Sequence, residues 1–179
     1  MSPNSALCGA RYFTKLDVHW SFNNVRIKPR DEWKAAFRTN CGLFEPLVMF
    51  FGMTNSPATF QTMMNDVFRT VIAKGIVIVY LDDILIFTKT EEEHEQAVQR
   101  VLEILMEHKL FLRLEKCEFH QKQIEYLGLV ILENKVAIDP VKVTRVCEWP
   151  ILENWTDIQA FIGFVNFYCH FIQDFSTIA

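Results

Sequence analysis

The chain has 179 residues, a net charge of −4, a hydrophobic fraction of 50% and an aromatic fraction of 13%. This length accommodates one domain with at most a small appendage, and the hydrophobic content excludes a disordered or low-complexity chain. No apolar run reaches the roughly 20 residues that a membrane helix requires. The first residues lack the basic and apolar stretches of a secretion signal. We therefore expect an intracellular protein, cytoplasmic or nuclear and not secreted, with no membrane partner.

Cysteine spacing and charge narrow the class further. The five cysteines are scattered and never in C-x-x-C spacing, which predicts reduced thiols in place of a disulfide framework or a zinc site. The sequence pI near 5.7 argues, taken alone, against a nucleic-acid-binding protein, because phosphate contacts normally come from a basic surface.

The first third of the chain reads as short strands followed by a helix. Strands are predicted over residues 12–18, 25–28, 35–39 and 44–48. The first contains Asp17 near its end, and an N-C-G turn joins the last two. Ser56 and Pro57 give an N-cap and a first helical position, and the helix that follows ends at Gly75.

A hairpin and a second long helix come next. Two β-rich runs, residues 76–80 and 84–87, flank Leu81-Asp82-Asp83, so the carboxylates lie at the tip of the predicted hairpin. Thr90 and Glu93 form a capping box at the start of the second helix.

The last third is predicted to hold a hairpin and two helices. The hairpin strands are residues 126–131 and 136–138, and Asp139-Pro140 starts a short helix. Thr156 with Gln159 is predicted to cap the final helix.

This order of elements predicts an α+β fold: an antiparallel sheet with helices packed on one face, of the ferredoxin-like kind. The other face is then exposed and available for a site. Trp149-Pro150 is the best boundary, giving residues 1–149 as the main domain and 150–179 as a small helical fragment.

Three carboxylates are the best candidates for chemistry. Adjacent Asp82 and Asp83 repel one another, and a divalent cation would relieve this repulsion, although an Asp-rich turn is a simple alternative. In the predicted sheet order, the strand that ends near Asp17 lies beside this hairpin. Carboxylates without nearby His or Cys suit Mg²⁺, and two such ions would support phosphoryl transfer.

The ordered motifs give a specific resemblance. In chain order they are Y-F-T-K-L-D from Tyr12, V-R-I-K-P from Val25, D-E-W-K-A-A-F-R-T from Asp31, T-N-S-P-A-T-F-Q from Thr54, Y-L-D-D-I-L-I-F from Tyr80, E-E-H from Glu92, L-E-K-C-E-F from Leu114, Y-L-G from Tyr126 and F-I-G-F-V-N-F-Y from Phe161. Over residues 11–179 the chain resembles the reverse transcriptase of gypsy-type long-terminal-repeat retrotransposons. The resemblance implies a polymerase palm with part of the fingers and the start of a thumb.

The resemblance also implies roles for individual residues. Asp17, Asp82 and Asp83 match the catalytic carboxylates, with Asp17 and Asp82 as the main ligands of two Mg²⁺ ions, for which Mn²⁺ can substitute. The nucleotide-binding residues are expected to be Val18, Phe22, Phe51 and Gly52. The template and primer residues are expected to be Pro57, Phe60, Leu127 and Gly128.

Two of these assignments have plain structural alternatives. Phe22, which matches the aromatic residue that excludes a ribose 2′-hydroxyl, could be an ordinary core aromatic. Leu127-Gly128, which matches the primer grip, could be a strand with a close-packed glycine.

The implied function is RNA-directed DNA polymerisation on an RNA or DNA template-primer duplex with deoxynucleotide triphosphates. The alternative is an inactive remnant that binds nucleic acid or self-associates through thumb aromatics. Departures from the family pattern at His19, Cys169 and His170 favour this alternative, and the aromatics in question are Phe164, Phe167, Phe171 and Phe175. A two-metal nuclease is a third reading.

Overall fold

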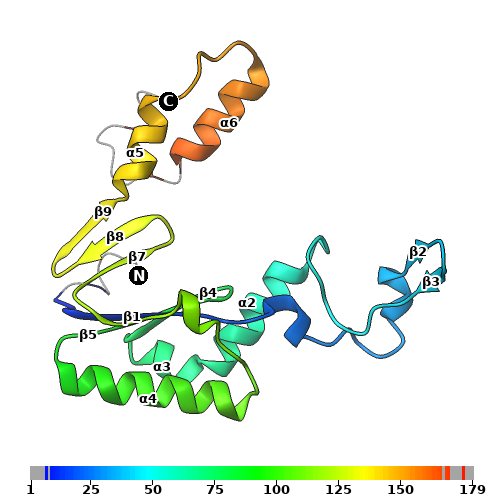
Figure 1. Cartoon of the computed structure of the whole chain (residues 1–179), viewed down its shortest axis with the longest axis horizontal. Helices are drawn as coiled ribbons and strands as arrows, with labels where there is room; N and C mark the ends of the chain where they lie inside the picture. The colour runs from blue at the N-terminus through cyan, green and yellow to red at the C-terminus, as the bar shows by residue number, and fades with distance from the viewer. Residues whose placement is uncertain (1–6, 8, 167, 170–174, 176–179) are drawn as a thin grey trace.

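The computed structural model describes residues 7, 9–166, 168, 169 and 175. Figure 1 shows a central sheet covered by helices on one side and by a small second sheet on the other. A hairpin projects from one end of the molecule, and two helices lie beyond the small sheet, far from the hairpin.

The central sheet has four antiparallel strands in the order β4-β5-β1-β6. Its strands are β1 (Tyr12–Asp17), β4 (Val77–Tyr80), β5 (Asp83–Thr88) and β6 (Glu118–Gln121). The helices are α2 (Ser56–Val67), α3 (Arg69–Ala73) and α4 (Glu91–Glu107). Chain order and strand order together are those of a ferredoxin-like fold, as predicted from the sequence.

Strand alternation builds a separate core on each face of this sheet. Leu16 and Ile84 lie in the helix-side core with Phe60 of α2 and Val101 of α4. Phe13, Leu85 and Phe87 lie in the opposite core with Ile124 and Ile131.

The second core belongs to the small sheet. That sheet is β7-β8-β9, with strands β7 (Gln123–Tyr126), β8 (Leu129–Leu132) and β9 (Lys135–Ile138). We expected one face of the central sheet to be exposed. The small sheet covers the part of that face formed by Phe13, Leu85 and Phe87, so the expectation was wrong there. The apolar positions on both faces of β1 and β5 require a cover on each side.

The first strand of the projecting hairpin is shorter than predicted, and the second begins earlier, at Gly42 instead of residue 44, and ends at Phe44. The hairpin consists of β2 (Phe37–Thr39) and β3 (Gly42–Phe44), with every residue exposed. Residues 25–28 form no strand; they make an isolated bridge, Arg26 to Val48, with flanking hydrogen bonds from Ile27 N to Leu47 O and from Met49 N to Val25 O.

Helix caps explain three boundaries that sequence patterns addressed. Thr90 Oγ1 accepts from Glu93 N at 3.3 Å, which confirms the predicted cap of α4. Asp139 Oδ1 accepts from Val141 N at 2.9 Å and starts α5 (Pro140–Cys147), also as predicted. Ser56 is the first residue of α2 and not its N-cap, which is Asn55.

The final helix, α6 (Trp155–Asn166), begins slightly earlier than the sequence suggested. Asn154 Oδ1 accepts from Asp157 N at 3.0 Å, so this pair replaces the predicted Thr156 and Gln159 pair. Asparagine is as good an N-cap as threonine, and the two patterns overlap here.

Helices α5 and α6 meet through aromatic side chains. The ring centroids of Phe161 and Phe164 both lie 5.4 Å from that of Trp149. Phe164 and Phe175 are half-buried, whereas Phe167 and Phe171 lie outside the described residues. The boundary at residue 149 stays a prediction. None of the described helices has the length and hydrophobicity to cross a bilayer.

Candidate active site

Two carboxylates from distant parts of the chain face one another at the end of the central sheet. Asp17, the last residue of β1, pairs in register with Asp83, the first residue of β5. Side chains directly opposite across an antiparallel pair leave the same face, with Cβ atoms about 5 Å apart. Asp82 lies one residue earlier, in the β4–β5 turn. The structure thus brings Asp17 and Asp83 together, with Asp82 adjacent.

The turn that carries Asp82 is fixed by two outside contacts. Leu81 has a left-handed backbone, φ 52°, and its N–H donates to Gln61 Oε1 of α2 at 2.7 Å. Gln61 Nε2 also donates to Val79 O at 3.1 Å. Val18 N donates to Asp82 O at 2.8 Å and joins the turn to the end of β1. Sequence reasoning gave Gln61 no role, although it lies in the matched T-N-S-P-A-T-F-Q stretch.

Two cations face Asp17. Arg113 Nε lies 3.6 Å from Asp17 Oδ1, and Lys116 Nζ lies 3.6 Å from Asp17 Oδ2. Asp17 is 8% exposed. Both contacts are too long for hydrogen bonds, and its buried Oδ1 has no hydrogen-bond partner. Arg113 and Lys116 lie in the segment before β6, far from Asp17 in sequence. Among the sequence patterns, only the L-E-K-C-E-F motif singled out this segment.

Asp83 has the clearest electrostatic perturbation of the three. Burial raises its pKa, and the negative charges of Asp82 and Asp17 raise it further, against a smaller opposing effect of Lys15 and Lys116. Burial is thus the main reason that the ionised form of Asp83 is disfavoured, and repulsion by the other two carboxylates adds to it.

The side-chain oxygens of the three carboxylates suit a hard divalent cation, but among the described residues they are not arranged as a closed metal site. The oxygen atoms of Asp17, Asp82 and Asp83 are the ligands that Mg²⁺ prefers, and the orphaned Asp17 Oδ1 can accept a metal. Within the described residues, no three His, Cys, Asp or Glu side chains converge as a ready metal site. The expectation that Asp82 is a main ligand stays a prediction, since it is Asp83 that lies opposite Asp17.

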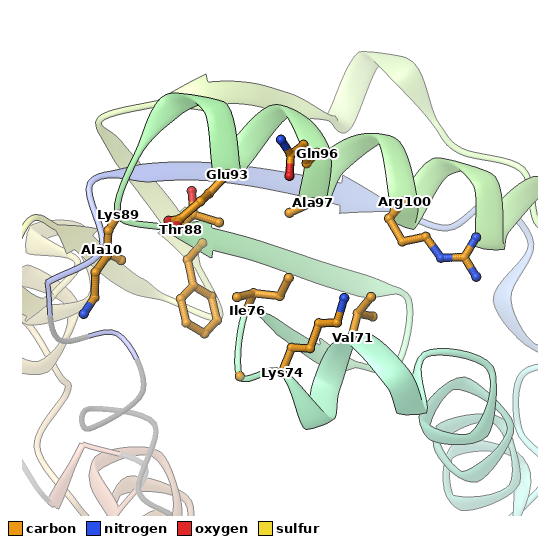
Figure 2. Close-up of a pocket in the computed structure, with 12 residues that line it drawn as sticks. Ala10, Val71, Lys74, Ile76, Thr88, Lys89, Glu93, Gln96, Ala97 and Arg100 are labelled. Carbon is orange, nitrogen blue, oxygen red and sulfur yellow. The ribbon is translucent and has the colours of Figure 1, made fainter.

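A cavity of about 420 Å³ lies beside the carboxylates. Its lining includes Asp17, Asp83, Lys15, Glu115 and Lys116. A second cavity, of about 500 Å³, lies between α3 and α4 and contains none of the predicted site residues. Figure 2 shows its lining, with Val71 on α3, Lys74 directly after α3, and Ala97 and Arg100 on α4.

The residues predicted to bind nucleotide lie next to β1. The side chain of Val18 is fully buried, and its N–H is already bonded to Asp82 O. That amide is therefore not free to bind a triphosphate, and the expectation that the backbone from Val18 to Phe22 approaches the nucleotide stays a prediction. Phe51 is 70% exposed, and the neighbouring Gly52 has a φ of 103° that favours glycine.

Phe22 is packed between two other aromatic rings. It is 7% exposed, and its centroid lies 4.7 Å from that of Phe51 and 5.7 Å from that of Phe60. Its alternative reading as a core aromatic therefore has direct support, and its gating role stays a prediction. Phe60 is fully buried against Phe22, and its expected place in the segment that supports the template stays a prediction. Pro57 is exposed at the start of α2.

Leu127 and Gly128 form the tight turn between β7 and β8. Both residues have positive φ, 51° and 75°, as in a type I′ hairpin turn. The alternative reading of this pair as strand residues was thus wrong. A Cβ on Gly128 would lie 3.2 Å from Tyr168 Oη, so the position has little room for a side chain.

A ferredoxin-like sheet with carboxylates from its first strand and its central hairpin defines the palm of a nucleic acid polymerase. A profile of the reverse transcriptase (RNA-dependent DNA polymerase) family matches residues 3–131. The chain belongs to this family.

Related sequences come from mobile elements. The chain is 37% identical over 169 residues to the Retrovirus-related Pol polyprotein from transposon 297 of Drosophila melanogaster, covering 94% of this chain and 16% of that protein. It is 36% identical over 170 residues to the Transposon Tf2-3 polyprotein of Schizosaccharomyces pombe, covering 95% and 13%. The chain thus spans less than a fifth of these relatives.

Solved structures support the fold. The foamy viral protease-reverse transcriptase dRH in complex with ds DNA has a TM-score of 0.84 and 24% identity, covering 96% of this chain and 30% of that one. The foamy viral protease-reverse transcriptase in complex with RNA/DNA hybrid has a TM-score of 0.82 and 23% identity, covering 99% and 24%.

Proposed function

We propose that this chain is the palm of an RNA-directed DNA polymerase and extends a primer 3′ end with deoxynucleotide triphosphates. The observation that carries the proposal is the register pairing of Asp17 with Asp83 on a reverse transcriptase fold. Structures of the foamy viral protease-reverse transcriptase in complex with ds DNA and with RNA/DNA hybrid support a template-primer duplex as the partner.

Asp17, Asp82 and Asp83 would hold Mg²⁺, with Mn²⁺ as a substitute. When bound, two such ions activate an attacking hydroxyl and stabilise the leaving oxygen of a phosphoryl transfer. The backbone that carries the carboxylates is fixed by Gln61 at the turn and by the bond from Val18 N to Asp82 O at the end of β1. Arg113 and Lys116 balance part of their charge.

The surrounding residues would position the two substrates. The Leu127-Gly128 turn is suited to support the primer end, since the β7–β8 hairpin packs directly on the catalytic strands. Exposed Phe51 and Gly52, next to Phe22, are suited to border the incoming nucleotide.

An exposed basic group compensates locally for the acidic net charge. Its members are Arg26, Lys28, Arg30, Lys34 and Arg38, all in or next to the projecting hairpin. Among the described contacts of this group, Lys34 pairs with Asp31 at 2.8 Å. We infer that this group contacts the template backbone, with the strong salt dependence of phosphate contacts. An intracellular location follows from this function.

Primer extension with a duplex-binding control tests the proposal. The unmodified chain and its Asp82→Asn, Asp83→Asn variant are given an RNA template, a DNA primer, deoxynucleotides and Mg²⁺. Extension by the unmodified chain alone supports a polymerase. Equal duplex binding by both chains without extension favours the non-enzymatic remnant, and primer shortening favours a nuclease. Light scattering on the same samples tests self-association through the thumb aromatics Phe164, Phe167, Phe171 and Phe175.

A further inference from the structure

A buried histidine outside the active site joins three strands of the palm to α4. His94, in the first turn of α4, is fully buried. Its Nε2 lies 2.7 Å from Thr14 Oγ1 of β1, and its Nδ1 lies 3.1 Å from Thr88 Oγ1 of β5. The His120 ring of β6 packs edge-on at 5.0 Å.

The hydrogen bonds around His94 permit only one assignment of donors and acceptors. Thr88 Oγ1 donates its single proton to Thr90 O at 3.0 Å, so it must accept from His94 Nδ1–H. His94 Nε2 then carries no proton and accepts from Thr14 Oγ1–H. Thr14 Oγ1 in turn accepts from His120 N at 3.1 Å. Every member of this chain is satisfied only when His94 is the neutral Nδ1–H tautomer.

The series of hydrogen bonds from Thr88 through His94 and Thr14 ends at a β-bulge in strand β6. Strand β6 pairs with β1 at Phe13–Gln121 and at Lys15–Glu118, so two β6 residues lie opposite Thr14. One of them, His120, has a left-handed backbone with φ 52°. Its N–H has the Thr14 hydroxyl as partner, which means that Thr14 stabilises the bulge directly.

The bulge lies just after the residues that face Asp17. We define the flanking segment as residues 113–118, which contains Arg113 and Lys116. Its start is bonded to β1 through Arg113 N and Asp17 O at 3.0 Å, and its end through Lys15 Nζ and Glu118 Oε1 at 2.7 Å. The position of residues 113–118 along β1, between these two contacts, therefore depends on where the bulge begins.

We propose that His94, through Thr14, is a positioning residue that fixes the β6 bulge and thereby holds Arg113 and Lys116 of the flanking segment against Asp17. The importance of this contact for catalysis rests on the proposed function. The hydrogen-bond chain itself does not.

Protonation of His94 is incompatible with this arrangement. A proton on Nε2 leaves the Thr14 hydroxyl without its acceptor. The groups that face His94 offer no compensating anion: the Tyr12 ring lies 6.2 Å away on β1, His120 lies on β6, and Thr88 lies on β5. Burial and the neighbouring His120 lower the pKa of His94 to about 4.

The half-buried thiol of Cys117 reports on the flanking segment. Its Sγ donates to Arg113 O at 3.2 Å, and burial raises its pKa, so it reacts slowly while the segment is in place. Iodoacetamide labelling is followed residue by residue with mass spectrometry, and exposed Cys41 serves as the internal reference. Thr14→Val removes the hydroxyl at nearly constant volume, whereas Thr14→Ser keeps it.

We expect Cys117 of Thr14→Val to label about fivefold faster, the factor that one lost hydrogen bond of ordinary strength gives. Cys41 should be unchanged, and Thr14→Ser should label like the unmodified chain. A core variant of the second face, Ile131→Val, controls for a general loss of stability. Equal acceleration in Ile131→Val, or none in Thr14→Val, would overturn the proposal.

A second measurement needs no variant. Long-range ¹H–¹⁵N spectra of the unmodified chain at pH 6 should show His94 as the neutral Nδ1–H tautomer. The Nε2–H tautomer or an imidazolium signal would contradict the direction of the hydrogen bonds. Neither experiment uses a primer, nucleotide or metal, so failure here is separable from failure of the proposed function.

Discussion

Tyr126 donates a hydrogen bond from its hydroxyl to the main-chain carbonyl of Asp83 at 3.2 Å. The bond joins the last residue of β7, directly before the Leu127-Gly128 turn, to the first residue of strand β5, which carries one of the candidate carboxylates. Tyr126 is 5% exposed, and burial together with nearby Asp83 raises the pKa of its hydroxyl, so it remains a donor. The small sheet and the active site are therefore directly coupled.

Loss of this hydroxyl should weaken both the fold and the reaction. Tyr126→Phe should lower the free energy of unfolding by about 1 kcal/mol, the ordinary net worth of one hydrogen bond, as measured by urea denaturation. Extension should fall several-fold if the hairpin positions the primer. Tyr12→Phe is the control, since its hydroxyl contacts exposed Glu91 at 3.4 Å. Equal effects of the two variants would contradict the coupling.

Removing the negative charge of Asp83 should raise the stability of the protein and weaken the binding of Mg²⁺ at the candidate site. Because the pKa of Asp83 is raised in the folded state, its ionised form is disfavoured there. Asp83→Asn should therefore raise stability at pH 7 by less than about 1 kcal/mol, since the group is partly solvated. The gain should disappear at pH values below the ordinary carboxyl pKa. Mg²⁺ should raise the melting temperature of the unmodified chain more than that of the variant.

Asp31→Asn is the matched control for Asp83→Asn. Asp31 pairs with Lys34, which lowers its pKa, so the loss of its charge should not stabilise. Stabilisation by both variants would show a general charge effect in place of local repulsion.

His94 should make the fold sensitive to acid. Its pKa is about 4 in the folded state, and the unfolded chain takes up a proton below about 6.5, so stability should fall as the pH drops through this window. The loss should be at most about 3 kcal/mol. Urea denaturation across pH 4–7 should show a shallower slope for His94→Gln. His108→Gln, at the exposed end of α4, should leave the slope unchanged.

Gln61 should control the shape of the carboxylate turn. Gln61→Leu leaves Leu81 N–H and Val79 C=O without this partner, which should cost about 1–3 kcal/mol of stability. Extension should fall more than duplex binding does. Gln61→Glu keeps the acceptor for Leu81 and should be intermediate. Gln99→Leu removes an exposed amide contact on α4 and should change neither property.

Local patterns predicted the elements whose signals lie within a few residues. The Thr90 cap, the Asp139 cap and the hairpin around Asp82 were all recognisable, whereas β6, the fourth strand of the central sheet, was not predicted. Strand β1 was predicted over residues 12–18 and ends one residue earlier, at Asp17.

Contacts between distant segments were beyond sequence patterns. The approach of Arg113 to Asp17 depends on how residues 113–118 leave α4, and no local spacing encodes it. The burial of Phe22 against Phe60 depends on the packing of α2. The cover of the second sheet face was missed because β7 is short and has only one strongly apolar alternation, at Ile124 and Tyr126.

The most direct measurement is addition of a single deoxynucleotide to a labelled DNA primer on an RNA template in Mg²⁺. The unmodified chain is compared with Asp17→Asn and with Glu103→Gln, a carboxylate of α4 that pairs with Arg100 away from the site. Addition by the unmodified chain and by Glu103→Gln, with none by a folded Asp17→Asn, is the result that we predict. Equal addition by Asp17→Asn would contradict the assignment of catalysis to the facing carboxylates of β1 and β5.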